Sequence, residues 1–299
     1  MNIKLSIIIP AYREKYLNKT IDSLLENAVG EVEIIPVIDC YVPDEPIRVD
    51  DRVRPVILEK NVGMRGAINA GLKASTGEFI MKLDAHCGVA KGFDEVLKND
   101  CKENWLMVPR RYALNEETWE KNSPAVDYHY LIFPDFADDS YGYSIQVTGW
   151  RKKRHDEIEI DDIMTFQGSC WFANKKYFME HVGFLDDRLE TYGTFAQDQQ
   201  EIGLKYWLGG GEVKVDKRTW YAHLFKQKRH YASSIFSRKH KKDKYHVQGN
   251  IWGTKYWVND SKPNMIYTFE WFISKFWPIP TWQENWRQIL IDKGVIGIK

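Results

Sequence analysis

The 299-residue sequence predicts an α/β fold with a mostly parallel central sheet and a C-terminal extension. Three observations support this prediction: short apolar runs rich in β-branched residues, segments with apolar residues at helical spacing between them, and Pro or Gly where these segments end. The first run, 5–9, is closed by Pro10 and is typical of a strand buried on both faces. Parallel strands that alternate with helices bind ligands at their carboxyl ends.

The N-terminal third of the chain keeps this alternation. Helices are expected over 16–28 and 63–74, and further strands over 33–38, 53–58 and 78–83. Asp39 and Asp84 each lie just past the end of one of these strands. Both carboxylates are therefore expected at the edge of the sheet where a ligand binds.

The alternation stops after a strand over 105–109. Segment 110–165 is long, aromatic and interrupted by proline and glycine, which indicates a loop-rich region. Order returns with a strand over 166–174, a helix over 197–208 and short strands over 213–225. We therefore expect three parts: 1–110, 111–231, and a basic, Trp-rich C-terminal extension at 232–299.

Composition excludes little about partners, because 42 Lys and Arg residues balance 42 Asp and Glu residues. The four cysteines are scattered and form no C-x-x-C pair, which argues against a disulfide framework and against a structural zinc site. No run of about 20 apolar residues is present, so no membrane span is expected. We expect a cytoplasmic protein.

The triplet Asp84-Ala85-His86 directly follows a predicted strand. Side chains at i and i+2 of an extended segment point the same way, so this carboxylate and imidazole can share one ligand. A mixed oxygen and nitrogen site suits manganese or a similar divalent ion, which can neutralise the charge of a departing diphosphate. The alternative is a polar turn with a surface histidine.

Four stretches resemble the family-2 glycosyltransferases and the polypeptide N-acetylgalactosaminyltransferases, which share the GT-A fold. They are Ile8–Glu14, Pro36–Asp39, Asn61–Ala67 and Phe79–Cys87. The last is similar to the metal motif of the second family, in which D-x-H replaces D-x-D. The resemblance implies a GT-A-like (Rossmann-like) nucleotide-sugar-binding fold. In this fold we expect 1–110 to be the nucleotide-sugar-binding half and 111–231 the half that binds the acceptor and completes the metal site.

The resemblance also implies which residues bind the donor. They are Pro10, Ala11, Tyr12, Glu14, Asp39, Arg65, Asp84, Ala85, Gly168 and Ser169. Asp39 is expected to contact uracil and Arg65 the base or the diphosphate. The alternatives are that Asp39 caps the next turn and that Arg65 pairs with a surface acid.

Two downstream segments match the same families. Tyr221–Tyr231 resembles the segment in which a histidine supplies the third metal ligand, so His223 is expected to join Asp84 and His86. In that match Lys226 takes the place of a basic residue near the phosphates. Gly168–Ala173 resembles a strand of small residues where bulk would block the donor sugar.

Asp198 has two functional interpretations. In inverting family-2 enzymes a similarly placed Asp is the general base, whereas in retaining enzymes the equivalent acid binds sugar or acceptor. A helix N-cap is the structural alternative. The D-x-H motif and the His223 segment favour retention. Segment Phe195–Gln199 departs from the W-G-G-E-N of the N-acetylgalactosaminyltransferases, so acceptor or sugar contacts are expected to differ.

The sequence thus predicts a metal-dependent transferase, favoured as retaining, that moves a sugar from a UDP-sugar to an acceptor hydroxyl with Mn²⁺ or another divalent cation. The alternatives are an inverting transferase acting on a protein or glycan, an inactive nucleotide-sugar- or glycan-binding module, and a nucleotidyltransferase. No segment resembles the family's membrane anchor or lectin domain, so a Golgi-type role is not expected.

Basic residues are dense over 226–244. This segment is expected to close over the diphosphate as a lid or to contact a polyanion such as DNA, with a solvated helix face as the alternative. The DNA interpretation is slightly favoured and suggests a hydroxymethylated base as acceptor. The tryptophans of the C-terminal extension indicate packing, with stacking on sugars or bases as the alternative.

Overall fold

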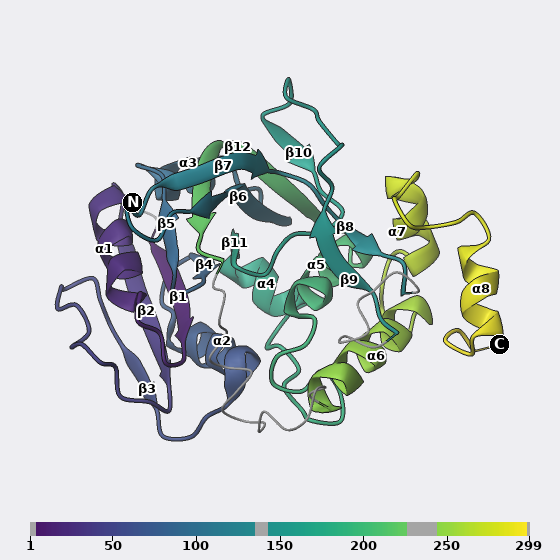
Figure 1. Cartoon of the computed structure of the whole chain (residues 1–299), viewed down its shortest axis with the longest axis horizontal. Coiled ribbons are helices and arrows are strands. Elements are labelled where there is room, and N and C mark those ends of the chain that lie inside the picture. Colours follow the sequence, from purple (N-terminus) through teal and green to yellow (C-terminus); the bar gives the residue numbers. More distant parts are fainter. Residues whose placement is uncertain (1–3, 135–142, 226–243, 298–299) are drawn as a thin grey trace.

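The structure is a computed structural model that describes residues 4–134, 143–225 and 244–297 (Figure 1). Its strands are β1 Leu5–Ala11, β2 Val32–Asp39, β3 Val56–Leu58, β4 Phe79–Leu83, β5 Cys87–Val89, β6 Trp105–Leu114, β7 Lys121–Val126, β8 His129–Ile132, β9 Gln146–Gly149, β10 Ile160–Asp162, β11 Cys170–Asn174 and β12 Glu212–His223. Its helices are α1 Leu17–Asn27, α2 Gly63–Ala74, α3 Phe93–Asp100, α4 Lys175–His181, α5 Asp198–Leu208, α6 Lys244–Val258, α7 Phe269–Phe276 and α8 Trp286–Asp292.

The central sheet confirms the predicted α/β class. Its strands follow the order β10-β12-β6-β11-β4-β1-β2-β3, and from β12 to β3 only β11 runs antiparallel to its neighbours. The apolar run of β1 lies between β2 and β4, where Ile7, Ile8 and Ile9 are fully buried. The carboxyl ends of β1, β2 and β4 therefore lie at one edge of the sheet, which is where Asp39 and Asp84 emerge.

The middle of the chain holds more strand than the sequence indicated. Segment 110–165 contains the end of β6 together with β7, β8, β9 and β10. The region expected as short strands is one strand, β12, with an irregularity in its pairing with β6 between Asp216 and Trp220. β6 crosses residue 110, so the sheet is continuous from the first expected part of the chain into the second.

The C-terminal helices α6, α7 and α8 lie at the end of the molecule opposite α1 and β3 (Figure 1). Trp257, Trp282 and Trp286 are buried in the core, and the Trp282 indole donates to the Leu131 carbonyl at 2.6 Å. These three tryptophans pack as the sequence indicated. Of the helices in the described ranges, none has the length and apolar character that a membrane span requires.

His129 on β8 gives the stability of the fold a pH dependence. Burial, together with the positive charges of Arg111 and Arg151, lowers the pKa of His129 from 6.5 to about 3. As the pH falls, the unfolded chain therefore binds this proton before the folded protein does. The stability that the folded protein gains from keeping His129 neutral is complete above pH 6.5 and is lost as the pH falls toward 3. Between pH 6 and 4 the unfolding free energy should fall by roughly 1.4 kcal/mol per pH unit more in the wild type than in His129→Gln. Urea titrations across this range measure the slopes, and equal slopes would contradict the assignment.

Candidate functional site: a metal centre at the sheet edge

Three side chains from two distant segments meet at the edge of the sheet. Asp84 follows β4, His86 lies between β4 and β5, and His223 ends β12. β5 pairs antiparallel with β12 so that Cys87 lies opposite His223, and the Leu224 amide donates to the His86 carbonyl at 3.0 Å. This short β5 strand is the local reason that a residue near position 223 reaches the D-x-H corner.

The spacing of the ligand atoms fits one divalent ion. The Nε2 atoms of His86 and His223 are 3.1 Å apart, and Asp84 Oδ2 lies 3.2 Å from His223 Nε2 and 3.9 Å from His86 Nε2. Neighbouring atoms in a tetrahedral or octahedral shell with ligand distances of about 2.1 Å are about 3.0–3.4 Å apart. Within the described part of the chain, these three side chains each offer one ligand atom, and the three atoms lie within 4.8 Å of one another, close enough to hold one metal ion.

The protonation states suit a metal. Burial lowers the pKa of His223 to about 4, against the opposing effect of Asp84, so its imidazole is neutral at pH 7. Burial acts to raise the pKa of Asp84, but the charge of Lys82 and the hydrogen bond from His223 hold it well below its usual range. The site therefore offers one carboxylate and at least one neutral imidazole nitrogen without first losing a proton.

Glu14 contacts His86, and its predicted contact with the donor stays a prediction. Its Oε2 is 3.1 Å from His86 Nδ1, and its Oε1 accepts from the Tyr16 amide at 3.1 Å. A proton on Nδ1 shared with this carboxylate leaves the lone pair of Nε2 directed at the metal position. Glu14 thus orients a metal ligand, which is a role that the sequence did not predict.

A buried lysine, which was also not predicted from the sequence, balances the negative charge of Asp84. Lys82 is 2% exposed, and its ammonium lies 2.5 Å from Asp84 Oδ1 and donates to the Gly168 carbonyl. Burial lowers its pKa, but the charges of Asp84 and Asp198 outweigh this effect and leave the pKa above its usual value. Lys82 is therefore charged. Because its ammonium contacts Asp84 Oδ1, the other oxygen, Oδ2, lies toward the histidines.

We expect Lys82→Met to lower kcat by a factor on the order of 10², because Asp84 and the turn at Gly168 lose the cation that fixes their relative positions. Lys73→Met, which removes a charge from α2, is the control and should keep the wild-type kcat. Steady-state kinetics at saturating donor measure both variants. A Lys82→Met enzyme as fast as the wild type would show that this ammonium does not position the site.

Gly168, Ser169 and Asp198 lie together beside Asp84, as the sequence indicated. The Asp84 amide donates to the Ser169 carbonyl at 2.8 Å, and Ser169 Oγ bonds the Tyr221 hydroxyl at 2.8 Å. A Cβ on residue 168 would lie 2.7 Å from Asp198 Oδ2, so a larger residue there would displace the Asp198 carboxylate. Burial raises the pKa of Asp198, and its Oδ2 has no hydrogen-bond partner within the described part of the chain.

Asp39 fixes the turn that leads into α2. It is 3% exposed and accepts hydrogen bonds from the Asn61 side chain at 2.9 Å and from the amides of Val62 and Gly63 at 2.8 and 2.9 Å. The capping alternative therefore has direct support, and the uracil contact stays a prediction.

The predicted donor loop begins beside Asp39. Pro10 and Ala11 end β1, and Ala11 pairs with Ile38 of β2. The Tyr12 ring packs edge-on against Tyr41, with ring centroids 6.0 Å apart. Ala85, between the two metal-facing residues, is buried. All four thus lie along the edge where β1, β2 and β4 end, and their contacts with a donor stay predictions.

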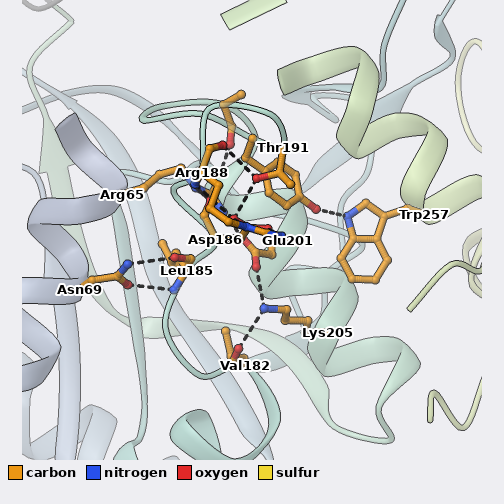
Figure 2. A network of polar contacts seen from close by, with 12 residues as sticks. Arg65, Asn69, Val182, Leu185, Asp186, Arg188, Thr191, Glu201, Lys205 and Trp257 are labelled. Atoms are coloured by element: carbon orange, nitrogen blue, oxygen red, sulfur yellow. Dashed lines mark hydrogen bonds and ion pairs between the residues drawn. The ribbon is translucent and has the colours of Figure 1, made fainter. Parts of the chain in front are cut away.

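The structure corrects the predicted role of Arg65 as a contact with the base or the diphosphate. Its side chain is 0% exposed and lies among polar groups of neighbouring segments (Figure 2). It bonds the Asp186 and Ala196 carbonyls, each at 2.7 Å, and forms an ion pair with Glu201. The Tyr192 ring packs 4.4 Å from the guanidinium carbon. Arg65 therefore joins α2 to α5 and has no exposed surface with which to contact a nucleotide.

Lys226 and the basic residues up to position 243 lie outside the described residues, and of Lys244 only the backbone is described, as the start of α6. The lid, the phosphate role of Lys226 and the DNA contact therefore stay predictions. The described site ends at Phe225, whose ring meets His223 edge-on with centroids 4.9 Å apart.

Known proteins are similar to this chain in sequence. Mouse polypeptide N-acetylgalactosaminyltransferase 3 is 29% identical over 238 residues, covering 75% of this chain and 37% of that protein. The human enzyme of the same name is 29% identical over 239 residues, with the same coverage. The chain thus spans little more than a third of the length of these relatives.

Solved structures agree at the level of the fold. The crystal structure of GalNAc-T7 with UDP, GalNAc and Mn²⁺ matches with a TM-score of 0.64 at 17% identity, covering 92% of this chain and 56% of that one. S. aureus TarS 1–349 in complex with UDP-GlcNAc matches with a TM-score of 0.50 at 16% identity, covering 78% of this chain and 61% of that one. Both are glycosyltransferase structures with this sheet arrangement, as the sequence predicted.

The family model of glycosyl transferase family 2 matches residues 6–182, which include β1, β4 and the Asp84–His86 corner. This match covers more than half of the chain. The protein belongs to glycosyl transferase family 2.

Proposed function

We propose that this protein transfers a sugar from a UDP-sugar to an acceptor hydroxyl, with a divalent cation bound by Asp84, His86 and His223. The convergence of these three side chains, 3.1 to 3.9 Å apart, is the observation that supports the proposal most directly. A divalent cation bound there stabilises negative charge on the departing diphosphate. Mn²⁺ is the first candidate, because the ligands are one oxygen and two nitrogens and because the GalNAc-T7 structure contains this ion.

The proposed donor is a UDP-N-acetylhexosamine. The relatives are named for N-acetylgalactosamine transfer, and the two structural neighbours contain UDP with GalNAc and UDP-GlcNAc. Gly168 and Ser169 provide a surface without bulk next to Asp84, which suits the sugar. Asp39 and the turn that it holds are the proposed contact for the uridine.

In the reaction, the bond between the anomeric carbon and the UDP oxygen breaks and a bond to the acceptor oxygen forms. The acceptor hydroxyl gives up one proton, which the departing diphosphate oxygen takes in a retaining reaction, where attack and departure share one face of the sugar. Asp198 is the candidate group near this reaction, because it is buried against Gly168 and has an oxygen without a partner among the described residues. In a retaining reaction it binds the sugar or acceptor, whereas in an inverting one it takes the proton. Retention is our proposal, and anomeric NMR of the product tests it.

The proposed acceptor is a hydroxyl on a protein or a glycan, following the names of the relatives. The hydroxymethylated DNA base was favoured because of segment 226–244, which lies almost wholly outside the described residues, and the relatives' names do not support it. A steep fall of acceptor binding with salt would restore the DNA candidate. A cytoplasmic location also stays a proposal.

Hydrolysis of a panel of UDP-sugars with and without Mn²⁺ tests the function. We expect Mn²⁺-dependent release of UDP from at least one UDP-N-acetylhexosamine. Calorimetric donor binding without release of UDP, even with acceptors present, would indicate a binding module instead. Release of pyrophosphate from a nucleoside triphosphate would indicate a nucleotidyltransferase.

A further inference from the structure

Arg111 on β6 is half-buried and has no acidic partner among the described residues. The neighbouring Arg110 forms a bidentate ion pair with Asp127, at 2.9 and 2.7 Å. Arg111 forms no such pair with any described carboxylate within 4.0 Å. Its Nε has no hydrogen-bond partner, and a terminal nitrogen lies 3.4 Å from His129 Nε2. A guanidinium removed from water without an anion is costly unless a ligand supplies one.

The charges around Arg111 are positive or neutral. Burial lowers its pKa, and the charge of Arg151 lowers it further. The groups that act in the opposite direction are Tyr221 and Cys87, a phenol and a thiol that are ordinarily neutral at pH 7. His129 is neutral as well, as shown above. No described carboxylate within 4.0 Å therefore balances the Arg111 guanidinium.

Arg111 belongs to the face of the sheet that carries the metal corner. In the parallel pairing of β6 and β12, Arg111 lies opposite Tyr221 and Ala113 lies opposite His223. Residues two apart in a strand share a face, so Arg111 and His223 are on the same side. The Phe225 ring contacts both, with the Arg111 guanidinium 5.2 Å from its centroid and the His223 ring 4.9 Å away. Arg111 thus lies next to the metal ligands but one aromatic ring away from them.

We propose that Arg111 binds a phosphate group carried by the acceptor, next to the hydroxyl that receives the sugar. This inference rests on the proposed function and specifies its acceptor. A guanidinium presents a planar pair of N–H donors that binds two anionic oxygens. A phosphate, with up to two negative charges, balances an unpaired guanidinium better than a carboxylate with one. The donor diphosphate belongs at Asp84 and the histidines, and the Phe225 ring contacts both Arg111 and His223.

Calorimetry with sulfate tests the proposal, because sulfate has the shape and charge of phosphate and does not precipitate Mn²⁺. We expect saturable sulfate binding to the full chain with saturating UDP and Mn²⁺, and at least a tenfold loss of affinity in Arg111→Gln. Arg287→Gln on α8, where Arg287 is 49% exposed, is the matched control and should bind sulfate like the wild type. The UDP affinity of Arg111→Gln should stay within twofold of the wild-type value.

Each other outcome overturns the proposal. A tenfold loss of UDP affinity in Arg111→Gln would assign Arg111 to the donor diphosphate. Sulfate binding that is absent, or equal in the wild type and Arg111→Gln, would show that no anion site exists there. Acetate binding as tight as sulfate would assign a carboxylate. The same titrations without nucleotide separate this inference from the proposed function, because a chain that binds no UDP can still be tested for the Arg111-dependent site.

Discussion

His223→Ala should lower the rate of sugar transfer by about 10³ or more and weaken Mn²⁺ binding in the same variant. Losing one of three protein ligands removes on the order of 4 kcal/mol of charge stabilisation from the transition state, and each 1.36 kcal/mol is tenfold in rate. The neutral imidazole at this position lies 3.1 Å from the other histidine ligand, so its loss leaves that histidine and Asp84 as the described ligands. Initial rates and Mn²⁺ titrations by electron paramagnetic resonance measure the two effects.

The control is His181→Ala. His181 is an exposed histidine at the end of α4 that stacks on Tyr177, so its loss should change neither quantity. A His223→Ala protein that transfers sugar at the wild-type rate with wild-type Mn²⁺ affinity would remove the metal centre as an explanation of activity. Loss of activity with unchanged Mn²⁺ affinity would place the ion elsewhere.

Arg65→Met should lower the free energy of unfolding by about 3–5 kcal/mol, because it leaves the buried carboxylate of Glu201 without its partner. Glu201 keeps one cation, Lys205, 2.5 Å from its Oε1, but burial lowers the pKa of Lys205 to about 8. The network also holds the segment between α4 and α5, where Asn69 of α2 exchanges two hydrogen bonds with Leu185 (Figure 2). Chemical denaturation of both proteins measures the difference.

Arg188→Met is the matched control within the same network. Arg188 is 63% exposed and pairs with Asp186 at the surface, so its loss should cost less than about 1 kcal/mol. Equal effects of the two substitutions would contradict the assignment of Arg65 to the interior. A stable Arg65→Met protein with weakened UDP binding would return Arg65 to the donor site.

The parts of the fold that could be predicted are those where burial dictates the residue type. The strands β1, β2 and β4 are mostly apolar, because both faces of a central parallel strand are covered. β7 and β10 are exposed or half-buried and carry polar residues, so segment 110–165 resembles a loop in sequence. α3, whose first turn is acidic, was missed for a similar reason, since its apolar positions are few.

The metal ligands could be predicted because a resemblance fixes their identity and their order along the chain. Resemblance does not show where a side chain points, which is why Arg65 was placed at the nucleotide although it faces the interior. Lys82 did leave a signal: it is a charge inside the run Phe79–Leu83, and a lysine in a buried strand requires acidic partners nearby. Glu14 and Arg111 left none, because their roles depend on neighbours that are distant in the sequence.

Anomalous diffraction from crystals grown with Mn²⁺ and UDP tests the central claim most directly. We expect one strong manganese peak within about 2.5 Å of Asp84 Oδ2 and of the Nε2 atoms of His86 and His223, with the UDP diphosphate at the same ion. A manganese peak elsewhere, or bound UDP with no ion among these three side chains, would contradict it.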